Sequence, residues 1–120
     1  MAKILVVEDF EDSRFSLCRL LEMSGHSVEE ATDGHMAVEM AVREQPDLVL
    51  MDLSLPGIDG IQATERIRRT EGIRQMPIVA VSAHDTAQFH DKALDAGCNA
   101  YITKPMDFDE LEALIARFVS

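Results

Sequence analysis

Five short strand-like segments, each followed by a stretch with helical spacing, constrain the fold of this chain more than any other feature. They cover residues 4–7, 28–31, 48–51, 78–81 and 100–103. Four are mainly apolar, and the segment 28–31 is polar-leaning, as expected at an edge of a sheet. Continuous Val, Ile and Leu runs bounded by turn residues are typical of strands buried on both faces of a parallel sheet. Strict alternation of strand and helix predicts parallel strands joined by right-handed crossovers. We therefore expect an α/β fold, a single (βα)5 doubly wound domain with a five-stranded parallel sheet, because five strands are too few to close a barrel of this kind.

The helices are predicted from apolar spacing and from capping residues, Gly and Pro at their ends. The spacing predicts helices over residues 12–24, 59–70 and 86–96, another that ends before Pro46, and a last one that begins near Asp107. The first helix is predicted to be capped by Asp12 or Ser13 and to face the core with Ser13, Leu17, Leu20, Leu21 and Ser24. Met36 and Met40 of the second helix are also predicted to face the core.

Composition and charge exclude several classes of function. The chain has 120 residues, 47% of them apolar and 28% charged, which is ordinary for one globular domain over residues 1–120. Its formal net charge of −11 repels nucleic acid and anionic lipid, so we expect neither DNA nor membrane binding. A divalent cation or a basic patch on a partner is favoured instead. The N-terminal apolar segment is too short for a signal peptide or a membrane span, and we expect a cytoplasmic protein.

The cysteines and most of the histidines form no recognisable metal or disulfide pattern. Cys18 and Cys98 are too isolated for a disulfide framework and are interpreted as small, semi-buried apolar residues in a reducing compartment. His26, His35 and His90 show no ligand spacing and are interpreted as surface residues.

Polar side chains follow four of the predicted strands at their carboxyl ends. They are Glu8 and Asp9, Asp52, Ser82 and Lys104. These strand ends meet at one edge of a parallel sheet, where open α/β folds bind their ligands. Clustered carboxylates repel one another unless a cation lies among them, and Mg²⁺ is a hard cation that prefers oxygen ligands. Carboxylate, cation, lysine and hydroxyl together supply what phosphoryl transfer needs, an attacking oxygen and neutralisation of the transferring group.

As a set, these residues closely resemble the receiver domains of response regulators in two-component signalling, over essentially the whole chain. The matching residues are Glu8-Asp9, Asp52, Pro56-Gly57, Gly60, Ser82-Ala83, Tyr101 and Lys104-Pro105. The chemotaxis regulator of this family has a flavodoxin-like fold with strand order 2-1-3-4-5, which the resemblance implies here. It also implies a cis peptide bond between Lys104 and Pro105.

The resemblance implies a role for each residue of the site. Asp52 is the expected phosphoacceptor, which attacks a phosphohistidine of a sensor histidine kinase or of a histidine phosphotransfer protein. Asp9 and Asp52 are expected to bind Mg²⁺ directly, together with the backbone carbonyl of Ser54, and Glu8 is expected to act through a bound water. Lys104 is expected to pair with Asp52 and then with the acyl phosphate. The acidic pair of the family is often Asp-Asp, and we expect Glu8 to change metal affinity more than chemistry.

The same resemblance predicts a signalling switch rather than an enzyme with an external substrate. Ser82 is expected to turn toward a phosphoryl oxygen, and Tyr101 to follow into the vacated space. The fourth helix, fifth strand and fifth helix would then bind a downstream effector protein. His84 is interpreted as an exposed loop residue at a position that flanks the phosphoryl group in this family. Phe15 is a candidate docking contact, since partners of this family grip the first helix. We expect a monomer or a transient dimer.

Alternatives remain open from the sequence. A phosphatase of the haloacid-dehalogenase type also uses an Asp after a parallel strand with Mg²⁺, but it would have a second Asp where this chain has Ser54. A receiver-like domain that binds partners without phosphorylation is less favoured, because every expected pocket residue is present. No G-x-x-x-x-G-K-[ST] or G-x-G-x-x-G motif supports nucleotide binding. Met1 leading directly into the first strand favours a stand-alone receiver over a module excised from a larger regulator or hybrid kinase.

Overall fold

Strands and helices alternate along the whole chain in a computed structural model that describes residues 2–55, 57–84 and 86–119. The strands are β1 (Lys3–Val7), β2 (Ser27–Ala31), β3 (Leu48–Asp52), β4 (Ile78–Ser82) and β5 (Ala100–Thr103). The helices are α1 (Glu11–Met23), α2 (Gly34–Glu44), α3 (Gly60–Arg69), α4 (Ala87–Ala96) and α5 (Phe108–Phe118). The predicted order of elements is confirmed.

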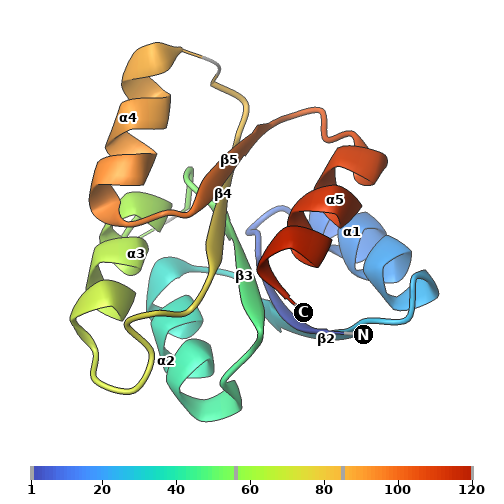
Figure 1. Cartoon of the computed structure of the whole chain (residues 1–120), viewed down its shortest axis with the longest axis horizontal. Helices are drawn as coiled ribbons and strands as arrows, with labels where there is room; N and C mark the ends of the chain where they lie inside the picture. The colour runs from blue at the N-terminus through green and yellow to red at the C-terminus, as the bar shows by residue number, and fades with distance from the viewer. Residues whose placement is uncertain (1, 56, 85, 120) are drawn as a thin grey trace.

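The strands form one parallel sheet in the order β2-β1-β3-β4-β5. Helices α1 and α5 cover one face of this sheet, and α2, α3 and α4 cover the other (Figure 1). The doubly wound arrangement and the strand order are therefore as expected. This order makes β1, β3 and β4 neighbours in the middle of the sheet, so their carboxyl ends lie side by side.

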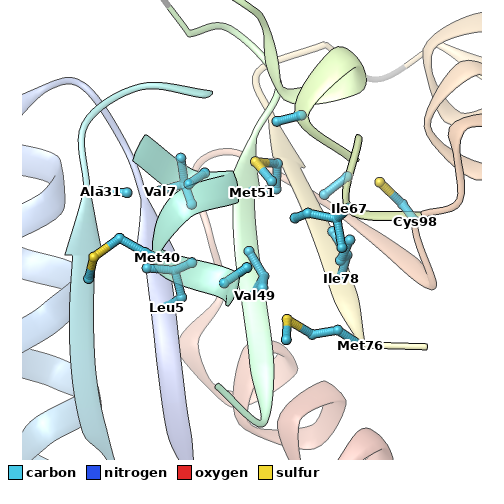
Figure 2. Close-up of a cluster of buried hydrophobic side chains, with 14 of the residues drawn as sticks. Leu5, Val7, Ala31, Met40, Val49, Met51, Ile67, Met76, Ile78 and Cys98 are labelled. Carbon is cyan, nitrogen blue, oxygen red and sulfur yellow. The ribbon is translucent and has the colours of Figure 1, made fainter. Parts of the chain in front are cut away.

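Alternate side chains of the strands pack into two cores, one on each face of the sheet. The core under α2, α3 and α4 includes Leu5, Val7, Val49, Met51 and Ile78 from the strands, with Met40 and Ile67 from the helices (Figure 2). The core under α1 and α5 includes Ile4, Val6, Leu48, Leu50 and Ile102, with Leu21, Leu111 and Ile115 from the helices. Each fully buried side chain of this size stabilises the fold by roughly 1.5–3 kcal/mol. Burial on both faces explains why the central strands β1, β3 and β4 are almost continuously apolar, whereas the edge strand β2 carries Glu29 and Glu30.

Four helices begin at a short polar side chain that accepts a backbone N–H of the first turn. These caps are Asp33, Asp59, Thr86 and Asp107. The exception is α1, whose cap position is Phe10 and has no side-chain hydrogen bond. Glu11 and Asp12 lie in its first turn, where negative charge favours the helix N-terminus. The prediction that Asp12 or Ser13 caps this helix is therefore wrong.

The buried face of α1 is also rotated from the predicted one. Its buried residues are Cys18 and Leu21, whereas Leu20 is 44% exposed and Ser13 and Ser24 are exposed. Cys18 and Leu21 lie against the sheet, and Leu20, two residues from Cys18 and so on nearly the opposite side of the helix from it, faces solvent. The helix therefore presents an apolar rim to solvent.

Two further predictions about single residues are wrong. His26 is not a surface residue, because its side chain is 9% exposed, its Nδ1 accepts the Ala2 N–H at 3.1 Å and its Nε2 lies 3.3 Å from Glu112 Oε1. These partners are far away in the sequence, so residue spacing could not indicate them. Met36 is 39% exposed, whereas Met40 lies in the core as predicted.

The two cysteines are free and buried, as expected. Burial, with the nearby charges of Glu30 and Glu22, raises the pKa of the Cys18 thiol to about 12. Its thiol therefore stays protonated at neutral pH. Across the described residues 2–55, 57–84 and 86–119, no helix has both the length and the apolar character needed to cross a bilayer.

Candidate functional site

Three side chains from the ends of β1, β3 and β5 converge at the carboxyl edge of the sheet. The pleat returns every second side chain to the same face. Counting two residues on from Val6, Leu50 and Ile102 of the α1–α5 core reaches Glu8, Asp52 and Lys104. Val7 and Met51 are in register, so Glu8 and Asp52 come next on adjacent strands. The regular alternation of the strands thus brings two acids and one lysine together.

The ammonium group of Lys104 lies between two buried carboxylates. Its Nζ donates to Glu8 Oε1 at 3.0 Å and to Asp52 Oδ2 at 3.1 Å. The Glu8 and Asp52 side chains are only 8% and 6% exposed, and burying such charges without a partner is costly. Burial lowers the pKa of Lys104, but the hydrogen bonds and charges of Glu8 and Asp52 outweigh burial and leave its pKa raised. Lys104 therefore stays positively charged at neutral pH.

The remaining oxygens of these carboxylates accept backbone N–H groups. Asp52 Oδ1 accepts the Ser54 N–H at 2.8 Å, and Glu8 Oε2 accepts the Phe10 N–H at 3.2 Å. Each acid is thus oriented by the loop that follows its own strand. Both buried carboxylates are satisfied on both oxygens.

The loop after Asp52 is held tightly by the start of α3. Asp59 and Gln62 form a reciprocal capping box at this start. A Cβ atom at Gly60 would meet the carbonyl oxygen of Asp52 and would lie 2.8 Å from Leu53 Cα. Only a glycine lets the helix begin so close to the end of β3.

Asp9 adds a third carboxylate to the site. Ligand oxygens of Glu8, Asp9 and Asp52 all lie within 4.8 Å of one another, and Asp9 is the exposed member. Mg²⁺ is commonly bound by one or two carboxylates while it keeps several waters. The donor set therefore fits a hard divalent cation reached from solvent through Asp9.

Ser82 and Tyr101 are linked through the backbone of the loop after β4. The His84 N–H donates to Ser82 Oγ at 3.1 Å, and the Tyr101 hydroxyl donates to the His84 carbonyl at 2.7 Å. Ser82 is 1% exposed, whereas Tyr101 is half-buried and stacks on His90 of α4 at 3.9 Å between ring centroids. A shift of this loop would therefore change the surroundings of both hydroxyl groups.

A hollow of about 250 Å³ opens beside the site, between α1 and the segment that joins β5 to α5. Leu17, Leu20 and Met106 form part of its apolar wall, and Glu8 and Lys104 lie at its edge. Phe10 and Phe15 are 61% and 60% exposed. A larger hollow of about 390 Å³, lined by Pro46 and residues 71–76, lies at the opposite edge of the sheet. Only the smaller hollow adjoins the acids.

The expected convergence of the strand-end residues is observed, while their roles stay predictions. Glu8, Asp9, Asp52 and Lys104 lie together. Ser54 contacts Asp52 through its backbone N–H. His84 is exposed as expected, and the peptide bond between Lys104 and Pro105 is cis, as the family resemblance implies. Pro56 of the predicted Pro-Gly turn lies outside the described residues.

Sequence reasoning missed the ion pair between Glu8 and Lys104, which are 96 positions apart. Only the residue type of Glu8 could have indicated this ion pair, because a glutamate side chain is longer than that of the aspartate often found at this position in the family. The contact of the Phe10 N–H with Glu8 was missed as well, since side-chain bonds to loop backbone have no residue-type signature.

Comparison with known proteins agrees with the fold. The family model of the response regulator receiver domain matches residues 4–116. The chain belongs to this family of two-component signalling receiver domains.

Several relatives show how such domains are used. PilH of Pseudomonas aeruginosa is 35% identical over 111 residues, which are 92% of this chain and 92% of PilH. The DNA-binding dual master transcriptional regulator RpaA of Synechocystis is 35% identical over 96% of this chain but only 48% of RpaA. The chain thus spans about half the length of some of the curated relatives that it matches.

A solved relative is the receiver domain of the sensor histidine kinase PA1611 of Pseudomonas aeruginosa. It is 36% identical, with a TM-score of 0.91 over 98% of this chain and 96% of that one. Its crystal structure has a magnesium ion coordinated in the active site cleft.

Proposed function

We propose that this chain is a phosphorylation-activated signalling switch in which Asp52 accepts a phosphoryl group from a phosphohistidine. The donor would be a sensor histidine kinase or a histidine phosphotransfer protein. The observation that carries the proposal is the ion pair of Lys104 with the buried Asp52, beside the carboxylates of Glu8 and Asp9. This arrangement supplies a nucleophile and a fixed positive charge at one place.

The proposed transfer forms one bond and breaks one. A carboxylate oxygen of Asp52 attacks the phosphorus of the donor phosphohistidine, and an O–P bond forms as the P–N bond breaks. The donor imidazole leaves with the electron pair of that bond. Lys104, whose Nζ is 3.1 Å from Asp52 Oδ2, stabilises the negative charge on the transferring group. The Ser54 N–H holds the carboxylate in one orientation.

The acids of the site are proposed to hold Mg²⁺. Asp9, Asp52 and the backbone carbonyl of Ser54 would bind it, and Glu8 would act through a water. When bound, Mg²⁺ supplies positive charge that offsets the charge on the phosphoryl oxygens. The magnesium in the PA1611 receiver domain supports this assignment.

Ser82 and Tyr101 are proposed to carry the change outward. A phosphoryl oxygen on Asp52 would be a new partner for the Ser82 hydroxyl, whose oxygen now accepts the His84 N–H. The Tyr101 hydroxyl is bonded to the carbonyl of the same His84, so the two groups respond together. If the region of β4, α4, β5 and α5 has two arrangements, phosphorylation that favours one of them by ~2–3 kcal/mol would change the affinity of the chain for an effector protein roughly 30–150-fold. The effector would bind the face formed by α4, β5 and α5.

The phosphodonor is proposed to dock over α1. The apolar hollow beside the site and the exposed Phe15 give this helix a surface that could be covered by a partner. A partner docked on α1 could place its histidine near Asp52, because the hollow beside α1 adjoins the edge of the sheet that carries Asp52. The acidic surface of the chain favours a partner with basic residues around its docking face.

We further propose a receiver that acts alone or as a module of a larger protein. PilH, matched over nearly its whole length, supports the first possibility. RpaA and the receiver domain of the PA1611 kinase support the second. In either case the phosphoryl group would be transferred to the chain's own aspartate rather than to an external substrate. The chain would act in the cytoplasm, as a monomer or a transient dimer.

Phosphotransfer profiling tests the proposed function. Each histidine kinase of the source organism is autophosphorylated with labelled ATP and then mixed briefly with the chain and Mg²⁺. We expect at least one kinase to lose label as the chain gains it, and no kinase to label an Asp52→Asn variant. If none labels the chain while other receivers are labelled in parallel, the proposal is wrong.

A further inference from the structure

Asp9 differs from the other two acids of the site in how its side chain is held. Glu8 and Asp52 are buried and accept hydrogen bonds from Lys104 and from loop N–H groups. Asp9 is exposed, and across the part of the chain that the structure describes no group donates a hydrogen bond to its carboxylate. The direction of Asp9 therefore depends on the backbone that carries it.

Arg14 of α1 holds this piece of backbone. Its Nη1 donates to the carbonyl oxygen of Glu8 at 3.0 Å, while the Glu8 N–H donates to the Ala31 carbonyl at 3.1 Å. The Glu8 carbonyl belongs to the planar peptide unit that ends at the Cα atom of Asp9. Holding the oxygen of this unit fixes the plane from which Asp9 projects. A guanidinium on the first helix thus limits the directions that Asp9 can take.

Glu30 of the edge strand β2 holds Arg14 in turn. Arg14 Nε donates to Glu30 Oε1 at 2.9 Å, and the side chains of Arg14 and Glu30 are 17% and 52% exposed. A planar guanidinium presents its donors in a fixed fork, so a bond to Glu30 also sets the direction of the bond to the Glu8 carbonyl. The negative charge of Glu30 offsets the positive charge that Arg14 brings to an edge of the sheet that suits a cation.

We propose that Arg14 is a positioning residue for Asp9, oriented by Glu30, and that it prepares the site for a divalent cation. The inference rests on the proposed function, which gives Asp9 its place as a direct ligand of Mg²⁺. Groups that orient the ligands of a metal typically change its affinity roughly 10- to 100-fold when they are removed. Arg14 would act in this way through a single peptide unit.

Positioning and charge predict opposite effects for the loss of Arg14. By charge alone, removal of a cationic side chain beside three carboxylates should tighten Mg²⁺ binding, because like charges repel. By positioning, loss of the bond to the Glu8 carbonyl frees Asp9, and the ion must then order this residue at a cost in conformational entropy. The direction of the change in affinity therefore decides between the two.

Calorimetric titration with Mg²⁺ alone measures this direction. Urea unfolding first establishes that each variant is folded. We expect Arg14→Met to weaken Mg²⁺ binding by about 10-fold, and Arg14→Lys to fall between it and the unaltered chain, since an ammonium lacks the fixed fork. Arg19→Met is the charge control on the same helix, where the guanidinium lies over the Phe15 ring, and it should not weaken binding. Unchanged or tighter binding in Arg14→Met overturns the inference.

A double-mutant cycle tests the part given to Glu30. Glu30→Ala and Glu29→Ala remove the same charge from the same strand. We expect Glu30→Ala to weaken Mg²⁺ binding more than Glu29→Ala does, and we expect this difference to disappear when residue 14 is changed to Met. A difference of the same size in both backgrounds would be an effect of charge and would overturn the role of Glu30.

Backbone mobility gives a readout that needs no metal. In ¹⁵N relaxation measurements without Mg²⁺, we expect Arg14→Met to lower the order parameter of the Asp9 amide. The Ser54 amide, which is bonded to Asp52 Oδ1, is the internal control and should be unchanged. If Arg14 were only structural, its loss would lower stability in urea and leave the mobility of Asp9 as it is, which would contradict the inference.

Labelling with acetyl phosphate separates failure of this inference from failure of the proposed function. We expect Arg14→Met to need more Mg²⁺ for half-maximal labelling but to reach the same level at saturating Mg²⁺. A chain that is labelled on Asp52 with a Mg²⁺ requirement independent of Arg14 would refute only the inference. A chain that is never labelled, but whose Mg²⁺ affinity and Asp9 mobility depend on Arg14, would refute the proposed function and leave the inference standing.

Discussion

At the scale of single residues, Lys104 decides whether the acids of the site can be buried. Its ammonium group lies within 3.1 Å of both Glu8 and Asp52, and its own side chain is 32% exposed. Two adjacent buried carboxylates without this cation would repel each other and lose their charge-assisted hydrogen bonds. The lysine is thus a structural counter-ion as well as the proposed partner of the phosphoryl group.

Replacement of this counter-ion should destabilise the fold. We expect Lys104→Met to lower the free energy of unfolding by about 1–2 kcal/mol at pH 7 without Mg²⁺, because it leaves buried charge unpaired. The pKa of Lys104 is raised in the folded chain, so its contribution is complete below the unfolded pKa near 10.4 and is lost as pH rises through the folded value. The difference between the two proteins should therefore stay constant from pH 7 to about 10 and shrink above it.

Urea unfolding followed by circular dichroism measures this difference across the pH range. Lys3→Met is the matched control, since it removes a more exposed ion pair with Glu44 and should lower stability less than Lys104→Met does. A difference that grows above pH 10, or none at pH 7, would contradict the role given to Lys104.

At the scale of elements, the position of Asp52 depends on how closely α3 begins against the end of β3. The capping box of Asp59 and Gln62 fixes the start of the helix, and Gly60 allows the backbones to touch. The helix start thereby limits how far the intervening loop can move. Asp52 is held in place by packing as well as by its hydrogen bonds.

A pair of glycine substitutions tests this packing. Gly60→Ala should cost about 3 kcal/mol and reduce phosphorylation of Asp52, because the new Cβ meets fixed backbone. Gly72→Ala serves as the control: Gly72 has a φ of 90° with nothing within 4 Å, so alanine there should cost about 1–2 kcal/mol and leave phosphorylation unchanged. Thermal and urea unfolding give the stabilities, and acetyl phosphate labelling gives the activity. Equal effects of the two substitutions would rule out a role for the helix start in placing Asp52.

Most elements could be predicted from the sequence because they have a local signal. The central strands are continuously apolar, every helix except α1 begins at a capping side chain, and strand ends carry the polar residues of the site. Contacts between distant segments lack such a signal. His26 accepts the Ala2 N–H and lies beside Glu112, and Arg68 donates to the carbonyls of Met76 and Gly97. The exposed rim of α1 was missed because the spacing of its leucines favoured a face that includes Leu20, whereas the buried face includes Cys18.

At the scale of the whole molecule, the site and the proposed output face lie on opposite sides of the loop after β4. The Ser82 carbonyl accepts the Lys104 N–H at 2.8 Å, so Ser82 borders the site, and Tyr101 lies on β5 against His90 of α4. The backbone of His84 is bonded to both Ser82 and Tyr101. The sheet itself is packed on both faces and can shift little, so we expect this loop and α4 to respond to a change at Asp52.

A phosphoryl mimic tests this connection. We expect beryllofluoride with Mg²⁺ to shift amide resonances of the pocket and also those of Tyr101, His90 and α4 in a ¹H–¹⁵N spectrum. Asp52→Asn is the control and should show none of these shifts. Tyr101→Phe should keep the pocket shifts but reduce those of α4, since the bond to the His84 carbonyl is lost. Shifts confined to the pocket of the unaltered chain would refute the proposed switch.

The most direct test of the central claim is to locate the phosphoryl group on the chain. The protein is incubated with acetyl phosphate and Mg²⁺, its intact mass is measured, and the acyl phosphate is trapped by reduction and placed by peptide sequencing. The account predicts one phosphoryl group per chain, on Asp52, dependent on Mg²⁺ and absent in Asp52→Asn. A label on another residue, or no label while a known receiver is modified under the same conditions, would contradict it.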